Sequence, residues 1–260
     1  MKIIDCHNHL HFERWLAKDY PENDFIVNTY CHRNFGEQDI LKNMEEAGIY
    51  KTIVFPMPSK YVDLEKANNY ILEQAKLHSE IIPFSVIDTK PEYWISKGAK
   101  GFKEHDYGQY TFRDKITRQP TFAQDFKETY KFMEEQGLPL ILHAGSNRIE
   151  RIQQDIYKDT PNLKIILAHL GADYNPLDKN QILKTLKELK NFPKLWFDIS
   201  TINEIGILKE AFNLVGSEKL LFGSDFPEES PKKTLARLSL LKLPKKDLEN
   251  VLYKNIEGIL

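Results

Sequence analysis

Two patterns of hydrophobic and polar residues alternate along the chain. Short apolar runs rich in β-branched residues recur eight times, which is typical of buried parallel strands. They are the opening segment 1–9, then 52–56, 81–87, 101–105, 139–143, 164–169, 195–199 and 220–225. Longer segments with apolar residues three or four positions apart predict helices. These are 37–47, 62–79, 91–97, 121–136, 147–158, 179–190, 203–215, 231–242 and 245–257.

The alternation of strands with helices indicates a parallel sheet, and eight repeats predict a closed (β/α)8 TIM barrel. An open, doubly wound sheet is the alternative, but no glycine-rich phosphate-binding turn follows the first strand. We expect long loops after strands one and four, at 10–36 and 106–120. Thr121 is the predicted N-cap of the helix that follows the second loop. No linker rich in Pro, Gly or Ser divides the chain, so we predict one domain over 1–260.

Composition narrows the class of protein. A net charge of −2 argues against a general attraction to nucleic acid or to acidic membranes. Two cysteines make no disulfide framework, and neither a signal peptide nor an apolar stretch long enough to cross a bilayer is found. We therefore expect a soluble, cytoplasmic protein. A homodimer is left open by the sequence.

Candidate chemistry begins with His7 and His9. In a strand, residues two apart point to the same face, so these imidazoles form half a metal site or begin a polar loop. Cys6 has the opposite parity, and we interpret it as a packing residue. Active sites of TIM barrels lie at the carboxyl ends of the strands. Five of the eight histidines lie at such ends, together with a lysine and an aspartate. The full set is His7, His9, Lys103, His105, His143, His169 and Asp225.

The motifs around these residues resemble those of the amidohydrolase superfamily, in particular the branch that includes aminocarboxymuconate-semialdehyde decarboxylase. The motifs are Asp5-Cys-His7-Asn-His9, Leu142-His143-Ala-Gly145, Ala168-His169-Leu-Gly171, Gly223-Ser-Asp225-Phe-Pro227 and the closing Asn255-Ile-Glu-Gly-Ile-Leu260. The resemblance runs from the first strand to the last helix and implies a metal-dependent TIM barrel.

The resemblance implies one divalent metal ion held by His7, His9, His143 and Asp225. Nitrogen-rich ligation favours zinc, with manganese and iron as alternatives. The metal would lower the pKa of a water molecule towards neutrality, and Asp225 would act as general base. His169 would contact that water or polarise the substrate, although in binuclear relatives the histidine of the sixth strand is itself a ligand.

Other polar residues are candidates for contacts around the metal. Binuclear relatives bridge two metals with a carboxylated lysine on strand four. We instead expect an unmodified Lys103 to bind a substrate carboxylate or carbonyl, with His105 and Arg148 as further substrate contacts. Asp5 shares parity with the two histidines and either orients one of them or bonds to the backbone. Asp198 and Ser200 either line the pocket or stabilise a turn.

Two reactions fit this set of ligands. The first is hydrolysis of a C–N or C–O bond in a small molecule that carries a carboxylate. The second is non-oxidative decarboxylation of an aromatic or unsaturated carboxylic acid, for which Lys103 or Arg148 would hold the carboxylate. The third reading is a barrel that has lost catalysis and only binds a ligand. Such a barrel would lack a metal ligand, and this sequence lacks none.

Overall fold

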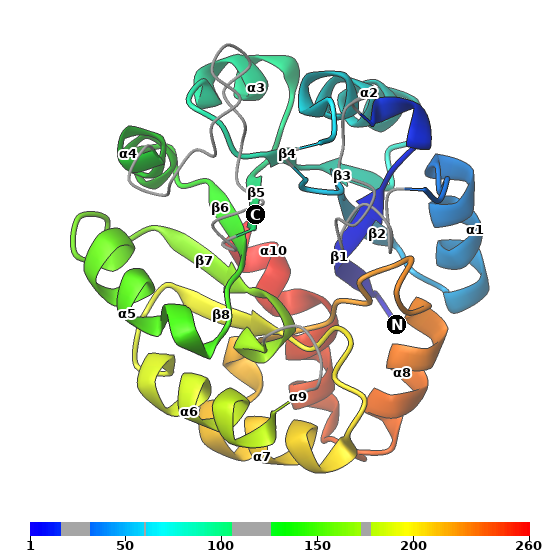
Figure 1. The fold of residues 1–260 in the computed structure, drawn as a ribbon. Coiled ribbons are helices and arrows are strands. Elements are labelled where there is room, and N and C mark those ends of the chain that lie inside the picture. The colour runs from blue at the N-terminus through cyan, green and yellow to red at the C-terminus, as the bar shows by residue number, and fades with distance from the viewer. Residues whose placement is uncertain (17–31, 60, 106–125, 173–177) are drawn as a thin grey trace.

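A ring of parallel strands surrounded by helices forms the molecule (Figure 1). The structure is a computed structural model that describes residues 1–16, 32–59, 61–105, 126–172 and 178–260. Its strands are β1 (Ile4–Leu10), β2 (Lys51–Pro56), β3 (Ile81–Pro83), β4 (Ser85–Val86), β5 (Phe102–His105), β6 (Pro139–His143), β7 (Lys164–Leu167), β8 (Leu195–Asp198) and β9 (Leu220–Leu221). The predicted barrel is confirmed.

The helices surround this ring, except for the last one, which lies across one opening (Figure 1). They are α1 (Glu37–Ala47), α2 (Leu64–Leu77), α3 (Pro91–Lys97), α4 (Lys127–Glu135), α5 (Ile149–Arg151), α6 (Lys179–Leu189), α7 (Ile205–Val215), α8 (Pro231–Ser239), α9 (Lys245–Glu249) and α10 (Asn255–Ile259). Shorter turns are η1 (Glu13–Trp15), η4 (Ser146–Arg148), η6 (Ala168–Gly171) and η7 (Ser217–Lys219), and π-helical turns are η5 (Ile152–Tyr157) and η8 (Asn250–Lys254).

Some predicted bounds agree with the structure and others do not. The helices predicted at 37–47 and 91–97 have those bounds, and each ends at a glycine with a left-handed backbone. The described part of the helix predicted at 121–136 is α4, which begins at Lys127. Its predicted cap Thr121, the loop at 106–120 and most of the loop at 10–36 lie outside the described residues.

Two junctions close the ring of strands. The third predicted strand changes neighbours at Phe84, whose N–H donates to Val54 O at 2.9 Å, while Ser85 N–H donates to Gly101 O at 3.1 Å. The predicted strand at 81–87 is therefore two strands, β3 and β4. At the other junction, Cys6 N–H donates to Phe222 O at 2.9 Å. Each backbone group paired in this way avoids the cost of burial without a partner.

Strand β1 contains a β-bulge, which decides where its side chains point. Ile4 pairs with Lys51 and Asp5 with Thr52, but Asn8 pairs with Val54, so β1 has one extra residue. The extra residue breaks the alternation of faces. Both Cys6 and His7 therefore lie beside Gly223 in the interior, where a Cβ on Gly223 would be 3.3 Å from Cys6 Sγ and 3.1 Å from His7 Cβ. Cys6 is a packing residue, as predicted, although it does not face away from His7.

The core has an inner and an outer part. Inside the ring, apolar side chains of the strands pack against Ile256 and Ile259 of α10, which lies across one opening of the barrel (Figure 1). Each fully buried side chain of this size contributes about 1.5–3 kcal/mol. Asn255 anchors this helix, because its side-chain amide donates to Ser217 O at 2.7 Å and to Leu220 O at 2.8 Å. The larger outer core fills the space between strands and helices.

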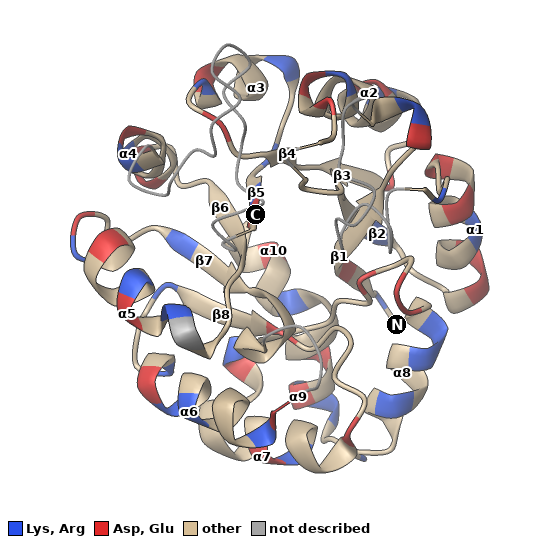
Figure 2. Cartoon of the chain, in the orientation of Figure 1, with Lys and Arg blue, Asp and Glu red and all other residues tan. Residues whose placement is uncertain are grey.

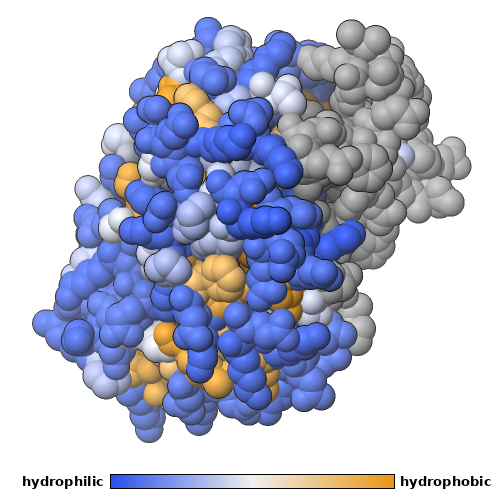
Figure 3. Space-filling model, turned by 90° about the vertical axis from the view of Figure 1, so that its left-hand side faces the viewer, coloured by the Kyte–Doolittle hydropathy of each residue, from blue (hydrophilic) through white to orange (hydrophobic). Residues whose placement is uncertain are grey.

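Charged residues lie mainly on the outer faces of the helices (Figure 2). The face that includes the left-hand side of Figure 1 is largely hydrophilic, with smaller apolar areas between the charges (Figure 3). Among the described residues, no helix is both long enough and apolar enough to cross a bilayer.

Candidate metal centre

Three side chains converge at the carboxyl end of the barrel. His7 and His9 extend from β1, and Asp225 follows β9. Asp225 Oδ1 lies 3.2 Å from His7 Nε2 and 3.1 Å from His9 Nε2. These three potential ligand atoms lie within 4.8 Å of one another. Their side chains are almost completely buried.

The backbone aims Asp225 at the two histidines. Its φ of 64° lies in the left-handed region, which costs a non-glycine residue about 1–3 kcal/mol. Two hydrogen bonds hold this conformation beside β1. Asp225 N–H donates to His7 O at 2.8 Å, and the preceding Ser224 N–H donates to Asp5 Oδ1 at 2.9 Å. Strain that the surrounding structure maintains in this way is common at functional sites.

Asp198, the last residue of β8, orients His7. Its Oδ2 lies 2.9 Å from His7 Nδ1, and both side chains are fully buried. With Nδ1 bound to a carboxylate, His7 presents Nε2 to the centre of the site. Histidines that bind a metal through one ring nitrogen typically donate the other ring N–H to a carboxylate in this way. The possible orienting role of Asp5 is wrong, because its Oδ1 accepts the backbone N–H groups of His7 and Ser224. Asp5 is itself buried and bonds to these backbone groups rather than to either imidazole.

His169 faces the second carboxylate oxygen of Asp225, and its ring centroid is 4.9 Å from that of His7. It lies in the turn η6 with a φ of 54°, so this left-handed turn rather than strand parity sets its direction. Its Nε2 is 3.9 Å from Asp225 Oδ2, and its Nδ1 is 2.7 Å from Ser200 Oγ. Asp225 therefore faces His7 and His9 with one oxygen and His169 with the other.

His143 and His105 form a neighbouring pair. They are directly paired in the register of β5 and β6, and their ring centroids are 4.2 Å apart. The ring of His143 is 4.7 Å from that of His169. His143 belongs to neither of the two groups of converging ligand atoms found among the described residues, which are His7–His9–Asp225 and His7–His169–Asp198. Its role as a fourth ligand stays a prediction.

Lys103 lies in the middle of the site rather than at its mouth. Its side chain is completely buried, with Nζ 3.5 Å from His7 Nε2 and 5.1 Å from the centroid of the Phe55 ring. Lys103 therefore does not reach the solvent. Arg148 is partly buried in the turn η4 after β6. The substrate contacts predicted for Lys103, His105 and Arg148 stay predictions.

Burial dominates the electrostatics of the site. It lowers the pKa of His9 to about 4 and the pKa of Lys103 to about 8, because a charged group loses its hydration there. Burial and Lys103 also oppose protonation of His7, but Asp198 and Asp225 outweigh them and raise its pKa. Burial alone would raise the pKa of Asp225, whereas His7 and His169 hold it well below its usual range.

The donor set fits a divalent cation. Asp225 Oδ1 is buried without a hydrogen-bond partner although two imidazole nitrogens lie within 3.2 Å of it. A buried carboxylate oxygen without a partner is costly, and a cation shared with the two nitrogens would satisfy it. Two imidazoles and a carboxylate are typical zinc ligands. His7, His9 and Asp225 therefore fit the metal that the sequence predicts.

Sequence reasoning left the role of Asp198 open between lining the pocket and stabilising a turn. The signal available was its place at the end of a predicted strand, on the same face as Ser200. Its partner His7 is 191 residues away, so no local pattern could indicate the contact. No sequence pattern singles out Glu104. It is buried behind the site, where Oε2 is 2.6 Å from Tyr130 OH and Oε1 is 2.8 Å from Arg151 Nη2.

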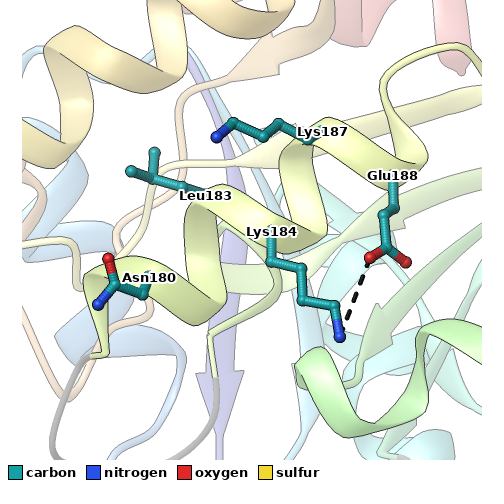
Figure 4. A pocket seen from close by; sticks show the side chains of 5 residues that line it. All are labelled: Asn180, Leu183, Lys184, Lys187 and Glu188. Carbon is teal, nitrogen blue, oxygen red and sulfur yellow. Dashed lines mark ion pairs between the residues drawn. The ribbon is translucent and has the colours of Figure 1, made fainter.

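A separate open pocket lies on the outer surface of α6 (Figure 4). It is lined by Asn180, Leu183, Lys184, Lys187 and Glu188. Lys184 forms an ion pair with Glu188 at 3.9 Å, an exposed contact one helical turn apart that contributes little energy. These residues belong to one exposed helix outside the barrel and take no part in the buried site.

Comparison with known proteins decides the family. A family model described as Amidohydrolase matches residues 92–260, which is well over half of the chain. The chain belongs to the amidohydrolase family. The resemblance seen in the motifs is therefore confirmed, and with it an enzyme of a metal-dependent superfamily. No curated protein sequence matches this amidohydrolase.

Solved structures support the fold of this amidohydrolase over its whole length. A 2,6-dihydroxybenzoate decarboxylase from Rhizobium has 14% identity and a TM-score of 0.73, covering 100% of this chain and 98% of its own. A zinc-bound amidohydrolase from Burkholderia multivorans has 15% identity and a TM-score of 0.75, with coverages of 100% and 99%. A protein from Acinetobacter baumannii, described as a probable 2-pyrone-4,6-dicarboxylic acid hydrolase, has 14% identity and a TM-score of 0.73, with coverages of 100% and 99%.

Proposed function

We propose that this amidohydrolase is a metal-dependent hydrolase that cleaves a C–O or C–N bond of a small molecule bearing a carboxylate. One observation carries the proposal: Asp225 directs Oδ1 at His7 and His9 and Oδ2 at His169. A carboxylate placed in this way serves the metal with one oxygen and exchanges protons with the other. A general base must lie within reach of the proton it removes, and Asp225 Oδ2 would do so for a water molecule held at the metal.

His7, His9 and Asp225 would hold the metal, with His143 as the proposed fourth ligand. Zinc is the proposed ion, since nitrogen ligands predominate. Bound there, it would supply Lewis acidity that activates water and polarises the bond to be cleaved. Asp198 would keep His7 in the required orientation through its contact with Nδ1.

The side chains of the site would then handle the protons. Asp225 accepts a proton from the attacking water while the water oxygen forms a bond to the acyl carbon. Asp225 then returns that proton to the leaving oxygen or nitrogen, so the products are a carboxylic acid and an alcohol or amine. His169 Nε2 faces Asp225 Oδ2 and would accept a hydrogen bond from that carboxyl once it is protonated.

The buried cation indicates the class of substrate. Lys103 Nζ lies 3.5 Å from His7 Nε2, close enough to the proposed metal to hold a second anionic group of the same small molecule. Burial strengthens a charged hydrogen bond to a carboxylate, because water no longer competes for it. His105 and Arg148 are proposed as further contacts to the substrate.

Decarboxylation is the second candidate, and Lys103 is also the observation that favours it. A carboxylate held against Lys103 would leave as CO2, and a proton would replace it on carbon. Two structural neighbours are decarboxylases, the Rhizobium enzyme above and a 5-carboxyvanillate decarboxylase from Sphingomonas paucimobilis. That likeness concerns the fold, which hosts both reactions.

The test uses zinc-loaded protein in water enriched in oxygen-18. Candidate substrates are lactones, esters and amides that carry a second carboxylate, tested beside aromatic and unsaturated carboxylic acids. We expect one oxygen-18 atom in the product acid, no CO2, and loss of turnover in Asp225→Asn. Release of CO2 without oxygen-18 in the organic product would overturn hydrolysis in favour of decarboxylation.

A further inference from the structure

A continuous chain of buried polar contacts joins His169 and His7, which face different oxygens of Asp225. It runs from His169 Nδ1 to Ser200 Oγ at 2.7 Å, from that hydroxyl to Asp198 Oδ1, and from Asp198 Oδ2 to His7 Nδ1 at 2.9 Å. Ser200 and Asp198 are completely buried. The carboxylate of Asp198, at the end of β8, thus contacts both β1 and the turn η6.

The direction of each hydrogen bond follows from the donors. Asp198 Oδ1 receives the backbone N–H groups of His169 at 3.1 Å and Ser200 at 3.0 Å, and these groups can only donate. The same oxygen therefore accepts from the Ser200 hydroxyl as well. A hydroxyl has a single proton, so Ser200 Oγ can only accept at its contact with His169.

His169 must then donate from Nδ1. A neutral imidazole carries one N–H, so its Nε2 is left with a lone pair. That nitrogen is the one that faces Asp225 Oδ2. By the same reasoning His7 donates Nδ1–H to Asp198 Oδ2 and presents a bare Nε2 to Asp225 Oδ1. The Asp198 carboxylate therefore sets the tautomers of both the His7 and the His169 ring.

We propose that Ser200 is a positioning residue that holds His169 in the tautomer with the proton on Nδ1, so that a bare Nε2 faces the reacting centre. The role of Ser200 in turnover rests on the proposed function, whereas its effect on the tautomer of His169 does not. Thr201 provides a natural comparison, because its Oγ1 is also near His169 Nδ1 but at the longer distance of 3.3 Å. Ser200, and not Thr201, links this nitrogen to Asp198.

The experiment reads the tautomer directly. Zinc-loaded protein labelled with 15N-histidine is measured by long-range 1H–15N correlation, which distinguishes a protonated ring nitrogen from a bare one. A His169→Asn variant assigns the signals. In the parent protein we expect His169 to show Nδ1–H. In Ser200→Ala we expect loss of that single tautomer, and in the matched Thr201→Ala we expect it to persist.

Kinetics and metal content complete the test. We expect Ser200→Ala to lower kcat about 10- to 100-fold, the usual effect of removing a partner of this kind, with KM and zinc content unchanged. Thr201→Ala should keep kcat close to that of the parent.

A parent His169 with its proton on Nε2, or a Ser200→Ala variant with the parent tautomer, would overturn the proposal. The parent spectrum decides the matter even if Ser200→Ala does not fold. If the tautomer is as expected but no substrate is hydrolysed, the proposed function fails and the assignment of Ser200 as the tautomer-setting residue holds.

Discussion

Asp198 Oδ2 lies 2.9 Å from His7 Nδ1, although 191 residues separate the two in sequence. Neither side chain is exposed to solvent. This contact fixes the orientation of the His7 ring, whose Nε2 faces Asp225 Oδ1 and Lys103 Nζ. The geometry of the site therefore depends on the junction where β8, β9 and β1 close the barrel.

Replacing Asp198 with asparagine should weaken metal binding about 10- to 100-fold, the usual cost of losing a carboxylate behind a metal-binding histidine. The amide carries one acceptor atom in place of two. It cannot accept from His7 Nδ1 and from the backbone N–H groups of His169 and Ser200 at the same time. The dissociation constant for zinc, measured by competition with a chelator, checks this expectation.

Asp178→Asn is the matched control for this change. Asp178 is exposed and caps α6 by accepting from Asn180 N–H at 2.8 Å, a role that asparagine also performs well. It should bind zinc as the parent does. Equal affinities in Asp198→Asn and Asp178→Asn would show that the Asp198–His7 contact does not support the metal.

Metal content should follow the three converging ligands. We expect about one divalent ion per chain, by mass spectrometry of protein purified without a histidine tag, since one group of ligand atoms fits one cation. His7→Ala and Asp225→Ala should both lose it. His78→Ala, at the end of α2, should keep it. Two ions per chain would contradict the mononuclear site and bring Lys103 and His169 among the ligands.

Lys103→Met should separate substrate binding from metal binding. Methionine fills a similar volume beside Phe55 but has no charge. If Lys103 holds a substrate carboxylate, KM should rise about 10- to 100-fold, since such a charged hydrogen bond is worth roughly 1.5–3 kcal/mol. Zinc content should not fall. Exposed Lys100→Met is the control, and loss of metal in Lys103→Met would instead identify this lysine as part of the metal site.

Gly223→Ala should disturb His7 without touching the metal itself. An added Cβ would lie 3.1 Å from His7 Cβ and 3.5 Å from Asp198 Cβ, so the neighbouring side chains must shift by a few tenths of an ångström. Overpacking of this kind costs about 1–3 kcal/mol, and we expect both the Tm and the zinc affinity to fall.

The glycine control lies in α7. A Cβ on Gly206 would meet no atom within 4 Å, and alanine in place of a helical glycine is neutral or stabilising when the backbone allows it. Gly206→Ala should therefore keep the Tm and zinc affinity of the parent. A Gly223→Ala variant that behaves in the same way would show that the close packing around His7 is not required.

Local sequence patterns were sufficient to predict the helices and strands and many of the candidate site residues. Apolar periodicity predicted the bounds of α1 and α3, because amphipathic helices follow from residues within a few turns. The alternation in β1 predicted that His7 and His9 share a face. Placement at the carboxyl ends of strands singled out Asp225 and His169, since parallel strands bring those ends together.

The remaining features of the site depend on contacts between strands that are far apart in the sequence. The sequence by itself determined the repeated strands and helices, and therefore the barrel, because each unit buries its own apolar face. It could not show that Asp5 bonds to the backbone, that Lys103 is buried, or that Asp198 orients His7. Those features depend on side chains from strands far apart in the sequence, which only the closed ring of strands brings together.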